Sequence, residues 1–297
     1  MKPKVSVVIP TIEEETLFDI IAELRKKLRG RVEIIVVDKS GDAYYNRVVA
    51  TGVTVLRQKD NGVERALMMG LKHAHGEILA STDADGTHGI EGIFKGIGLV
   101  EQGKADLVLG NRFGKLQKGS MSLHLRFGNA FLSKVYSIMY RSRLSDVLTG
   151  LFVMRRGAFE KIRENAPYRA GIAFFAIELA NRGYKIVDVP INYYPRKYGG
   201  SKLTKSKIFY GVNVASHIIR KARDYNPLLI FGGFGVVLIV LGGLLGIYVL
   251  YNYFATGTFL FIGRTLIAFM LVIVGILAII GGFILDLLLE IERKLNK

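Results

Sequence analysis

The sequence predicts an α/β domain with a parallel sheet, followed by two transmembrane helices. Short apolar runs alternate with helix-like segments between residues 5 and 110, as in sheets whose strands are joined by helices. Two later segments, 228–250 and 265–285, carry no charge and are long enough to cross the hydrocarbon core of a bilayer. We therefore expect a globular domain at 1–204, an amphipathic interface segment at 205–226, and a membrane region with a basic tail at 227–297.

Five apolar runs predict the strands of the sheet. The first, Val5 to Pro10, ends at a proline, and the second, Val32 to Val37, ends at Asp38. Further strands are expected at 53–56, 77–82 and 106–110. Helical periodicity predicts the connecting helices at 17–28, 62–73 and 90–100.

Charged residues follow the ends of the predicted strands. In a parallel sheet, ligands bind beyond the carboxyl ends of the strands. Glu14, Asp38, Asp83, Asp85 and Arg112 each fall just past such an end. We therefore expect these side chains to gather at one edge of the sheet and to form a ligand site.

The sequence Asp83-Ala84-Asp85 indicates a metal site. Two carboxylates one residue apart, after a buried strand, can hold a divalent ion that keeps some waters and binds substrate phosphates. Because the chain has no cysteine and five scattered histidines, we expect oxygen ligands and Mg²⁺ or Mn²⁺ at Asp83 and Asp85. Each acid also has a structural interpretation, as a turn residue or, for Glu14, as a helix cap.

Charge and hydropathy point to lipid and phosphate as partners. The formal net charge is +16, which suits nucleic acid, anionic lipid or phosphorylated substrates. The apolar segments and the lack of a DNA- or RNA-binding motif favour a lipid bilayer over nucleic acid. The first residues, Met1 to Lys4, lack the apolar core of a signal peptide, so we expect the globular domain in the cytoplasm.

Basic residues flank both apolar segments and set the expected topology. They occur before the first segment, between Arg196 and Arg223, and after the second, at Arg293, Lys294 and Lys297. By the positive-inside rule, both termini are cytoplasmic and the protein crosses the cell membrane twice. Glycines in the first apolar segment allow close helix packing, either within the hairpin or in a homo-oligomer. In the segment 205–226, apolar residues recur at helical spacing, which suits either a helix in the membrane interface or a helix packed on the globular domain.

A set of motifs in consistent order covers roughly residues 4–210 and resembles one enzyme family. The motifs are Val7-Val8-Ile9-Pro10-Thr11 with Glu14, Val36-Val37-Asp38, Thr82-Asp83-Ala84-Asp85, Leu109-Gly110-Asn111-Arg112, Ser145–Phe152 and Arg196–Leu203. They resemble the family-2 glycosyltransferases with a GT-A fold, particularly the polyprenyl-phosphate sugar synthases typified by dolichyl-phosphate mannose synthase. The resemblance implies a Rossmann-like, mixed but mostly parallel sheet with flanking helices. It also implies inverting transfer of a hexose, with mannose favoured, from a GDP- or UDP-linked nucleotide-sugar to polyprenyl or dolichyl phosphate.

The resemblance also implies roles for individual positions. Asp85, Arg112 and Arg126 would be catalytic, with Arg126 at the acceptor phosphate. The nucleotide-sugar would contact Pro10, Thr11, Glu14, Asp38, Asp83, Ala84, Asp85, Arg112, Arg196 and Lys202. The acceptor would contact Arg126, Asp146, Thr149, Gly150 and Ser201.

Three departures from the family pattern bear on the donor. Lys39 stands where a second acid is common, Ile12-Glu13 replaces a common Tyr-Asn pair, and Thr87 replaces a glutamine near the metal. Two alternatives stay open, a membrane-anchored transferase with a non-lipid acceptor and a non-catalytic nucleotide-sugar-binding protein. A polymerising synthase is disfavoured because the chain has no tryptophan, and a dinucleotide-dependent oxidoreductase because no Gly-x-Gly-x-x-Gly follows the first strand.

Overall fold

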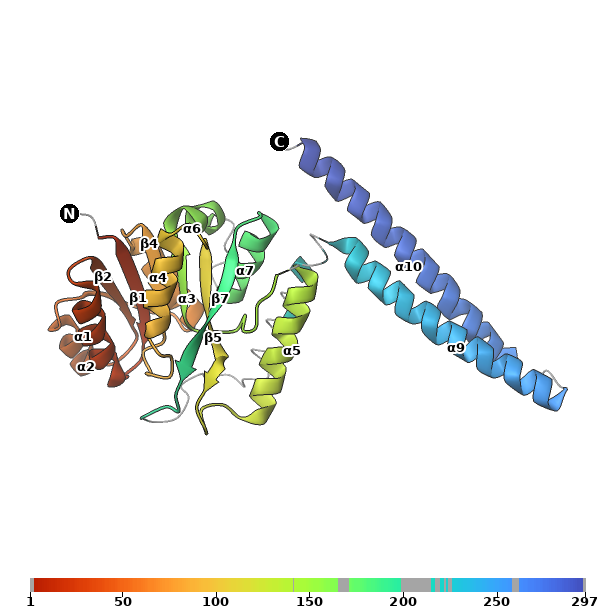
Figure 1. Cartoon of the computed structure of the whole chain (residues 1–297), viewed down its shortest axis with the longest axis horizontal. Coiled ribbons are helices and arrows are strands. Elements are labelled where there is room, and N and C mark those ends of the chain that lie inside the picture. The colour runs from red at the N-terminus through yellow and green to blue at the C-terminus, as the bar shows by residue number, and fades with distance from the viewer. Residues whose placement is uncertain are drawn as a thin grey trace. The chain divides into compact units, whose positions relative to one another are not determined.

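The chain forms two compact units, Met1–His217 and Ile218–Lys297. The computed structural model describes residues 3–140, 142–164, 171–198, 215–216, 220–221, 223, 226–257 and 262–295. The first unit is an α/β domain and the second is a helical hairpin (Figure 1). The expected interface segment at 205–226 lies mostly outside the described residues and stays a prediction.

The first unit is built on a seven-stranded sheet with the order β3-β2-β1-β4-β6-β5-β7. Strand β1 pairs in parallel with β2 and β4, and β5 pairs in parallel with β7. Strand β6 runs antiparallel between β4 and β5. The strands are β1 Val5–Thr11, β2 Val32–Asp38, β3 Thr54–Arg57, β4 Ile78–Ser81, β5 Leu107–Leu116, β6 Phe152–Arg155 and β7 Ile186–Tyr193.

Helices cover both faces of this sheet because the side chains of a strand alternate between its faces. On one face, Val7 and Ile9 of β1 belong to the core cluster that also contains Leu17 of α1 and Ile93 of α4. On the other face, α3 approaches so closely that a β carbon on its Gly70 would overlap Val8. The helices are α1 Thr16–Leu28, α2 Asp42–Val49, α3 Val63–His73, α4 Glu91–Glu101, α5 Leu123–Met139, α6 Arg156–Arg163 and α7 Ile172–Asn181.

The mixed, mostly parallel sheet expected from the family resemblance is confirmed. The apolar runs alone suggested a parallel sheet, and this was wrong for β6, which runs antiparallel to both neighbours. The run that forms β6 is four residues long, too short for its pattern to separate strand from buried helix. Strand direction depends on the route of the preceding segment, which apolar periodicity does not encode.

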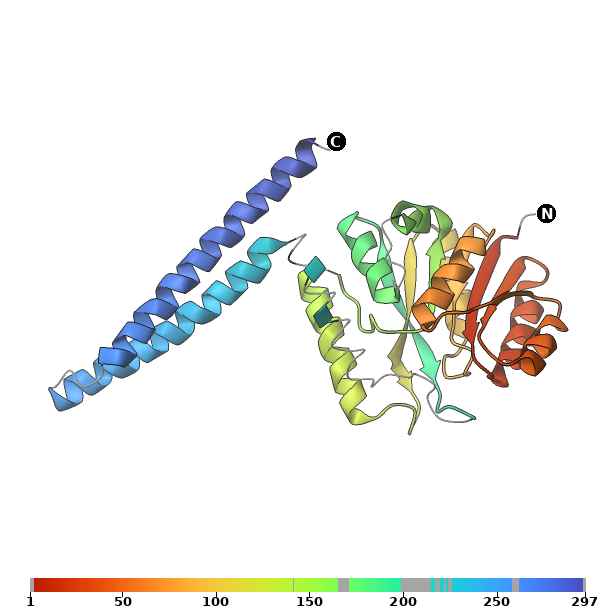
Figure 2. The same cartoon turned by 180° about the vertical axis from the view of Figure 1, so that it is seen from behind.

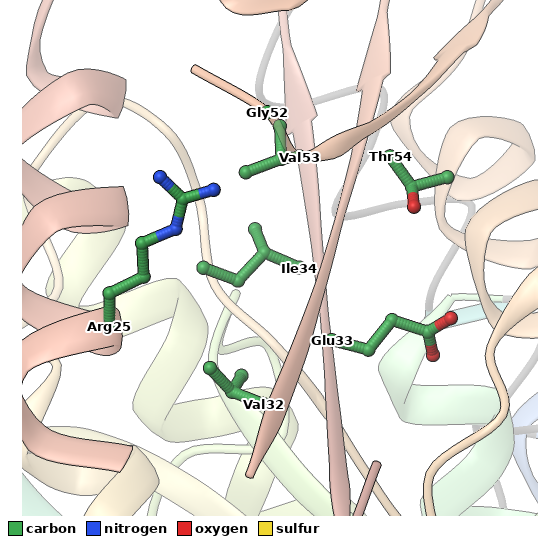
Figure 3. A pocket seen from close by; sticks show the side chains of 7 residues that line it. All are labelled: Arg25, Val32, Glu33, Ile34, Gly52, Val53 and Thr54. Carbon is green, nitrogen blue, oxygen red and sulfur yellow. The ribbon is translucent and has the colours of Figure 1, made fainter. Parts of the chain in front are cut away.

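A hydrogen-bonded brace holds the amino ends of the central strands together. Glu33 of β2 accepts hydrogen bonds from Ser6 Oγ of β1 at 2.5 Å and from the backbone N–H of His75 at 2.8 Å. Ser6 Oγ accepts a further bond from the N–H of Gly76, just before β4. These bonds lower the pKa of Glu33 despite its partial burial, which acts in the opposite direction. A shallow pocket at the same edge is lined by Arg25, Val32, Glu33, Ile34, Gly52, Val53 and Thr54 (Figure 3).

Glu33→Gln should destabilise the first unit by about 1–3 kcal/mol at neutral pH, because a charged acceptor of several hydrogen bonds is lost. The pKa of Glu33 is lowered in the folded state, so its contribution is complete above the unfolded value of 4.5 and is lost as the pH falls through the folded value. The stability gap between wild type and variant should therefore close in acid. Thermal unfolding followed by circular dichroism at several pH values measures the gap. The exposed Glu23→Gln serves as control, and a gap that does not change with pH would contradict the prediction.

The second unit is a hairpin of two long apolar helices. A π-helical turn, η1 Leu228–Gly232, leads into α9 Gly233–Thr256, and α10 spans Ile262–Leu295. By length and composition, Leu228–Thr256 and Ile262–Ile291 are both able to cross a membrane, with hydropathies of 2.7 and 2.9. Both helices extend beyond the uncharged segments predicted from the sequence.

Small residues set the packing distance within the hairpin. A β carbon on Gly235 would lie 2.7 Å from Cγ1 of Ile279, and one on Gly242 would lie 2.8 Å from the carbonyl oxygen of Ala268. These two glycines therefore allow α9 and α10 to approach closely, as small residues do between membrane helices. A β carbon on Gly243 or Gly246 would meet open space, so these two glycines do not serve the hairpin contact.

Candidate active site

The acidic residues predicted from strand ends lie at the carboxyl edge of β2, β1 and β4. Thr11, at the end of β1, is in register with Asp38, at the end of β2. On the other side of β1, strand β4 ends at Ser81, two residues before Asp83. Neighbouring strands are about 4.8 Å apart, so the chain positions of Asp38 and Asp83 are separated by roughly 10 Å across the sheet. A nucleoside diphosphate can span such a distance.

Asp83, Asp85 and His88 form a cluster at this edge. One potential ligand atom from each lies within 4.8 Å of those of the other two. Burial raises the pKa of Asp83, and the Asp85 carboxylate raises it further, while His88 partly offsets both effects. Two close carboxylates whose charges are imperfectly balanced are chemically suited to a divalent cation.

His88 is a site residue that the sequence analysis missed. It is buried, and its Nδ1 lies 3.5 Å from Oδ2 of Asp83, while Nε2 accepts a hydrogen bond from the N–H of Gly150 at 3.3 Å. Burial lowers the pKa of His88, so the imidazole is neutral at pH 7 with its proton on Nδ1. Nδ1 also lies within hydrogen-bond distance of the Thr87 hydroxyl, at 3.2 Å, so His88 connects the turn after β4 and the Asp83 carboxylate to the backbone of Gly150. The sequence analysis gave His88 no function, because no apolar run or charge pattern marks it as part of the site.

The turn after β4 fixes the second carboxylate. Thr87 donates hydrogen bonds to Oδ1 of Asp85 from its backbone N–H at 3.1 Å and from its hydroxyl at 2.8 Å. Gly86 between them has φ of +68°, a conformation that favours glycine. The carbonyl of buried Ala84 accepts a 2.5 Å bond from Thr16 of α1, which ties the loop to the domain. Thr87, which replaces the glutamine common in the family, therefore holds the Asp85 carboxylate in place through hydrogen bonds.

Arg196 brings a positive charge to the same carboxylates. Its guanidinium forms an ion pair with Glu14, and Nη1 lies 3.9 Å from Oδ2 of Asp85. It follows β7, so the carboxyl edges of β1, β4 and β7 contribute to one cluster. Asp83 and Asp85 fit a hard divalent cation, and Arg196 and Arg112 are placed to balance additional anionic charge.

Asp38 supplies an acceptor at the other end of the site. Its side chain is buried, and Oδ1 accepts bonds from the N–H and hydroxyl of Ser40 at 3.1 and 2.5 Å. Oδ2 is buried without a hydrogen-bond partner among the described residues, although Nη1 of Arg57 lies 3.7 Å away. Because a buried acceptor without a donor is costly, this oxygen is suited to a ligand N–H such as that of a nucleobase.

The loop between β1 and α1 is fixed by Tyr44 of α2, a helix the sequence analysis did not predict. Its hydroxyl donates to the carbonyl of Glu14 at 2.6 Å and accepts from the N–H of Glu14 at 3.1 Å. The same hydroxyl lies 3.4 Å from the buried Thr11 Oγ1. Pro10 precedes Thr11 within β1 and is partly exposed. The predicted donor residues at the end of β1 are therefore held in a defined conformation.

Arg112 and Asp146 form a buried, bidentate ion pair. Nε and Nη2 of Arg112 donate to the two carboxylate oxygens of Asp146 at 2.6 and 2.8 Å, and the Arg112 backbone N–H adds a third bond at 3.1 Å. Burial alone would lower the pKa of Arg112, but the charge and hydrogen bonds of Asp146 raise it above its ordinary value. The guanidinium also lies over the ring of Tyr193, 5.6 Å from its centre. Asp146 therefore fixes the orientation of Arg112.

Asp146→Asn should lower the free energy of unfolding by about 3–5 kcal/mol, because it leaves the Arg112 charge buried without its counter-ion. Thermal or denaturant unfolding measures this loss. Arg112→Leu combined with Asp146→Asn should cost less than the sum of the two single variants, because no unpaired charge is left. Additive losses would contradict a coupled pair.

The remaining predicted residues fall in three places. Buried Thr149 accepts a bond from the N–H of Leu151 at 3.3 Å, and the adjacent Gly150 lies against the Asp83 carboxylate, so this loop forms a wall of the cluster. Arg126 is exposed on α5, and no hydrogen bond or ion pair joins its side chain to the cluster among the described residues. Ser201 and Lys202 lie outside the described residues.

The sequence profile of glycosyl transferase family 2 matches residues 6–163. The chain belongs to this family. The family match covers β1 to β6, including the acid cluster and the Arg112–Asp146 pair. The expected family is confirmed, and the protein is a glycosyltransferase.

Several relatives of this glycosyltransferase carry similar sequences. Glycosyltransferase AglJ of Haloferax volcanii is 27% identical, covering 99% of this chain and 96% of the relative. A dolichyl-phosphate hexose transferase of the same organism is 29% identical over 64% of this chain and 82% of its own length. A dolichol-phosphate mannosyltransferase of Pyrococcus furiosus is 30% identical over 69% of this chain and 61% of its own length.

Solved structures share the fold of this glycosyltransferase. The S. aureus TarS fragment 1–349 in complex with UDP-GlcNAc has a TM-score of 0.54 at 19% identity, covering 73% of this chain and 66% of that one. Mannosyl-3-phosphoglycerate synthase from Rubrobacter xylanophilus has a TM-score of 0.50 at 16% identity, covering 74% of each chain. The expected GT-A fold is confirmed.

Proposed function

We propose that this glycosyltransferase is an inverting hexosyltransferase that moves a sugar from a nucleotide-sugar to polyprenyl or dolichyl phosphate. The strongest support is the Asp83–Asp85 carboxylate pair, which lies near Arg196 and Arg112 at the ligand-binding edge of the sheet. The relatives named for dolichyl-phosphate hexose and mannose transfer support the acceptor class, with mannose the favoured sugar. The donor is a GDP- or UDP-linked sugar.

The donor would lie along the carboxyl edge from Asp38 to Asp85. Buried Oδ2 of Asp38 would accept an N–H of the base, and buried Glu14 and Thr11 would contact the nucleoside. Asp83 and Asp85 would hold Mg²⁺ or Mn²⁺, which when bound neutralises charge on the diphosphate. Ala84 lies between these acids, and its carbonyl bond to Thr16 keeps both in position.

The acceptor needs no strong general base. A phosphate monoester has a second pKa of about 6, so its oxygen is already anionic near neutral pH. Transfer then depends on aligning the acceptor oxygen with the anomeric carbon and on stabilising the charge of the departing diphosphate. Arg112, held by Asp146, and Arg196 would carry out the second task. Attack from the face opposite the leaving group would invert the anomeric centre.

The acceptor side would be formed by the loop containing Thr149 and Gly150 and by Arg126. Arg126 is exposed on α5 next to apolar side chains, which suits the phosphate of a lipid. We also place Ser201 and Lys202 at the substrate phosphates, on the segment after Arg196. Asp146 would act on the acceptor through Arg112.

The enzyme would act at the cytoplasmic face of the cell membrane. The apolar helices α9 and α10 would cross the bilayer twice, and the basic residues on both flanks would keep both termini in the cytoplasm. We also keep, as part of this proposal, a catalytic domain that ends at residue 204, an interface segment at 205–226 and a membrane region that begins at residue 227. Nucleotide-sugars are water-soluble, so the donor would reach the active site from the cytoplasm.

The test is transfer of labelled sugar by the purified full-length protein. The protein is incubated in detergent with Mn²⁺ and a panel of labelled GDP- and UDP-sugars, with either polyprenyl phosphate or the matching polyprenol. We expect labelled lipid from one donor and from the phosphorylated acceptor alone, since the polyprenol has no anionic oxygen. Label on a non-lipid acceptor would overturn the proposed acceptor. Donor binding without transfer to any acceptor would favour a non-catalytic binding protein.

A further inference from the structure

Tyr193, the last residue of β7, lies among the charged groups of the site. Strand β7 is the edge strand of the sheet and pairs with β5, which carries Arg112 (Figures 1 and 2). The ring of Tyr193 is partly buried, and its centre lies 5.6 Å from the guanidinium carbon of Arg112. A guanidinium over the face of a tyrosine ring is attracted by the ring. The ring therefore adds to the support that Arg112 receives from Asp146.

The turn after β4 is bound to the same end of β7. His88 and Tyr193 form an antiparallel β-bridge, and the N–H of Tyr194 donates a 2.8 Å hydrogen bond to the carbonyl of Thr87. The rings of His88 and Tyr193 meet edge to face, with their centres 5.2 Å apart, which is a favoured arrangement of aromatic rings. The turn that carries the metal-site carboxylates and the end of β7 therefore hold each other in register.

The hydroxyl of Tyr193 is linked to the Asp85 carboxylate through Thr87. Burial raises the pKa of Tyr193 above its ordinary value, although the Arg112 charge and a hydrogen bond with the Thr87 side chain act in the opposite direction. The phenol is therefore neutral at pH 7 and able to donate a hydrogen bond. Thr87 gives its own hydroxyl hydrogen to Oδ1 of Asp85 at 2.8 Å, so its oxygen is left to accept the hydrogen of Tyr193.

We propose that Tyr193 is a positioning residue that fixes the Asp85 carboxylate relative to the Arg112 guanidinium. Its hydroxyl acts on Asp85 through Thr87, and its ring acts on Arg112 directly. In the proposed reaction Asp85 holds the metal at the donor diphosphate, and Arg112 balances charge on the same group, so the inference rests on the proposed function. The spacing of these two charges then depends on one side chain of β7, which itself contacts neither metal nor substrate.

The hydroxyl is tested by the binding of Mn²⁺ alone. Tyr193→Phe removes the hydroxyl and keeps the ring, so the support of Arg112 is retained. We expect the affinity of the full-length variant for Mn²⁺, followed by electron paramagnetic resonance in detergent, to fall by about 10-fold, as for residues that orient metal ligands. Turnover at saturating Mn²⁺ should stay close to that of the wild type, because the metal site is then filled. Tyr194→Phe, at the adjacent tyrosine that is 42% exposed, is the matched control and should bind Mn²⁺ like the wild type.

The ring is tested by comparing Tyr193→Leu with Tyr193→Phe. At saturating Mn²⁺ the leucine variant should turn over about 10²-fold more slowly than the phenylalanine variant. Loss of the ring lets Arg112 move, and a shift of about 1 Å in a group that stabilises the transition state can cost 10²-fold in rate. Tyr194→Leu is the control and should keep wild-type turnover. Circular dichroism checks the folding of each variant, and if Tyr193→Leu does not fold, the Mn²⁺ affinity of Tyr193→Phe decides alone.

Three results would overturn the proposal. Wild-type Mn²⁺ affinity in Tyr193→Phe would remove the hydroxyl from the support of Asp85. Equal turnover of Tyr193→Leu and Tyr193→Phe would remove the ring from the support of Arg112. A loss in Tyr194→Phe as large as that in Tyr193→Phe would assign the effect to general packing at the end of β7.

The Mn²⁺ measurement separates this inference from the proposed function. It needs no donor and no acceptor, so it decides the role of the Tyr193 hydroxyl even if the wild-type protein transfers no sugar. Sugar transfer by the wild type, together with unchanged Mn²⁺ binding by Tyr193→Phe, would overturn the positioning role and leave the proposed function intact.

Discussion

Replacing Asp85 with alanine should lower turnover by at least about 10³-fold while the protein stays folded. A metal-bound carboxylate site contributes several kcal/mol to stabilisation of transition-state charge, and each 1.36 kcal/mol is a factor of ten in rate. The described hydrogen bonds of the Asp85 side chain come from Thr87 in its own turn. Its loss should therefore change the local charge far more than the stability of the domain.

Two measurements separate this effect from unfolding. Turnover is measured with saturating donor, polyprenyl phosphate and Mn²⁺, and binding of Mn²⁺ alone is followed by electron paramagnetic resonance. Asp19→Ala, on the exposed side of α1, controls for loss of a carboxylate elsewhere in the domain. Wild-type turnover in the Asp85→Ala protein would remove this residue from the metal site.

The acids of the site could be predicted because strand ends share an edge. Asp38 and Asp83 follow apolar runs whose direction is the same, and the parallel pairing of β2 and β4 with β1 brings both to one side of the sheet. Local sequence is sufficient for this inference. The first residues of β1 to β5 were predicted to within one residue for the same reason, since each strand begins as a short apolar run. The expected end of β5 at residue 110 was wrong, because the strand continues through polar residues to Leu116.

The contacts that orient the side chains of the site could not be predicted in this way. His88 reaches Asp83 because the chain turns back at Gly86, and its second nitrogen meets Gly150, 62 positions later. Arg112 and Asp146 are 34 positions apart and meet through the loop that precedes β6. Strand β6 runs antiparallel to β4 and β5. Such contacts depend on the path of the chain between elements, which apolar periodicity does not report.

Gly150→Ala should lower turnover by about 10²-fold without a comparable loss of stability. A β carbon at this position would lie 2.8 Å from Cγ of Asp83 and would overlap one of its carboxylate oxygens. The backbone of Gly150 is outside the left-handed region, so alanine meets no conformational penalty there. The added methyl group must therefore displace the Asp83 carboxylate, and a shift of about 1 Å in a catalytic group can cost 10²-fold in rate.

The same substitution at a neutral position provides the control. At Gly157, on α6, a β carbon would meet open space, so Gly157→Ala should leave turnover unchanged and should not lower the unfolding temperature. Gly150→Ala should also weaken binding of Mn²⁺ alone, because Asp83 would no longer lie at its distance from Asp85. If Gly150→Ala kept full Mn²⁺ affinity and lost turnover, the methyl group would instead be obstructing the acceptor. Unchanged turnover with unchanged metal binding would show that the position of Asp83 is not critical, and the function of the cluster would then have to rest on Asp85.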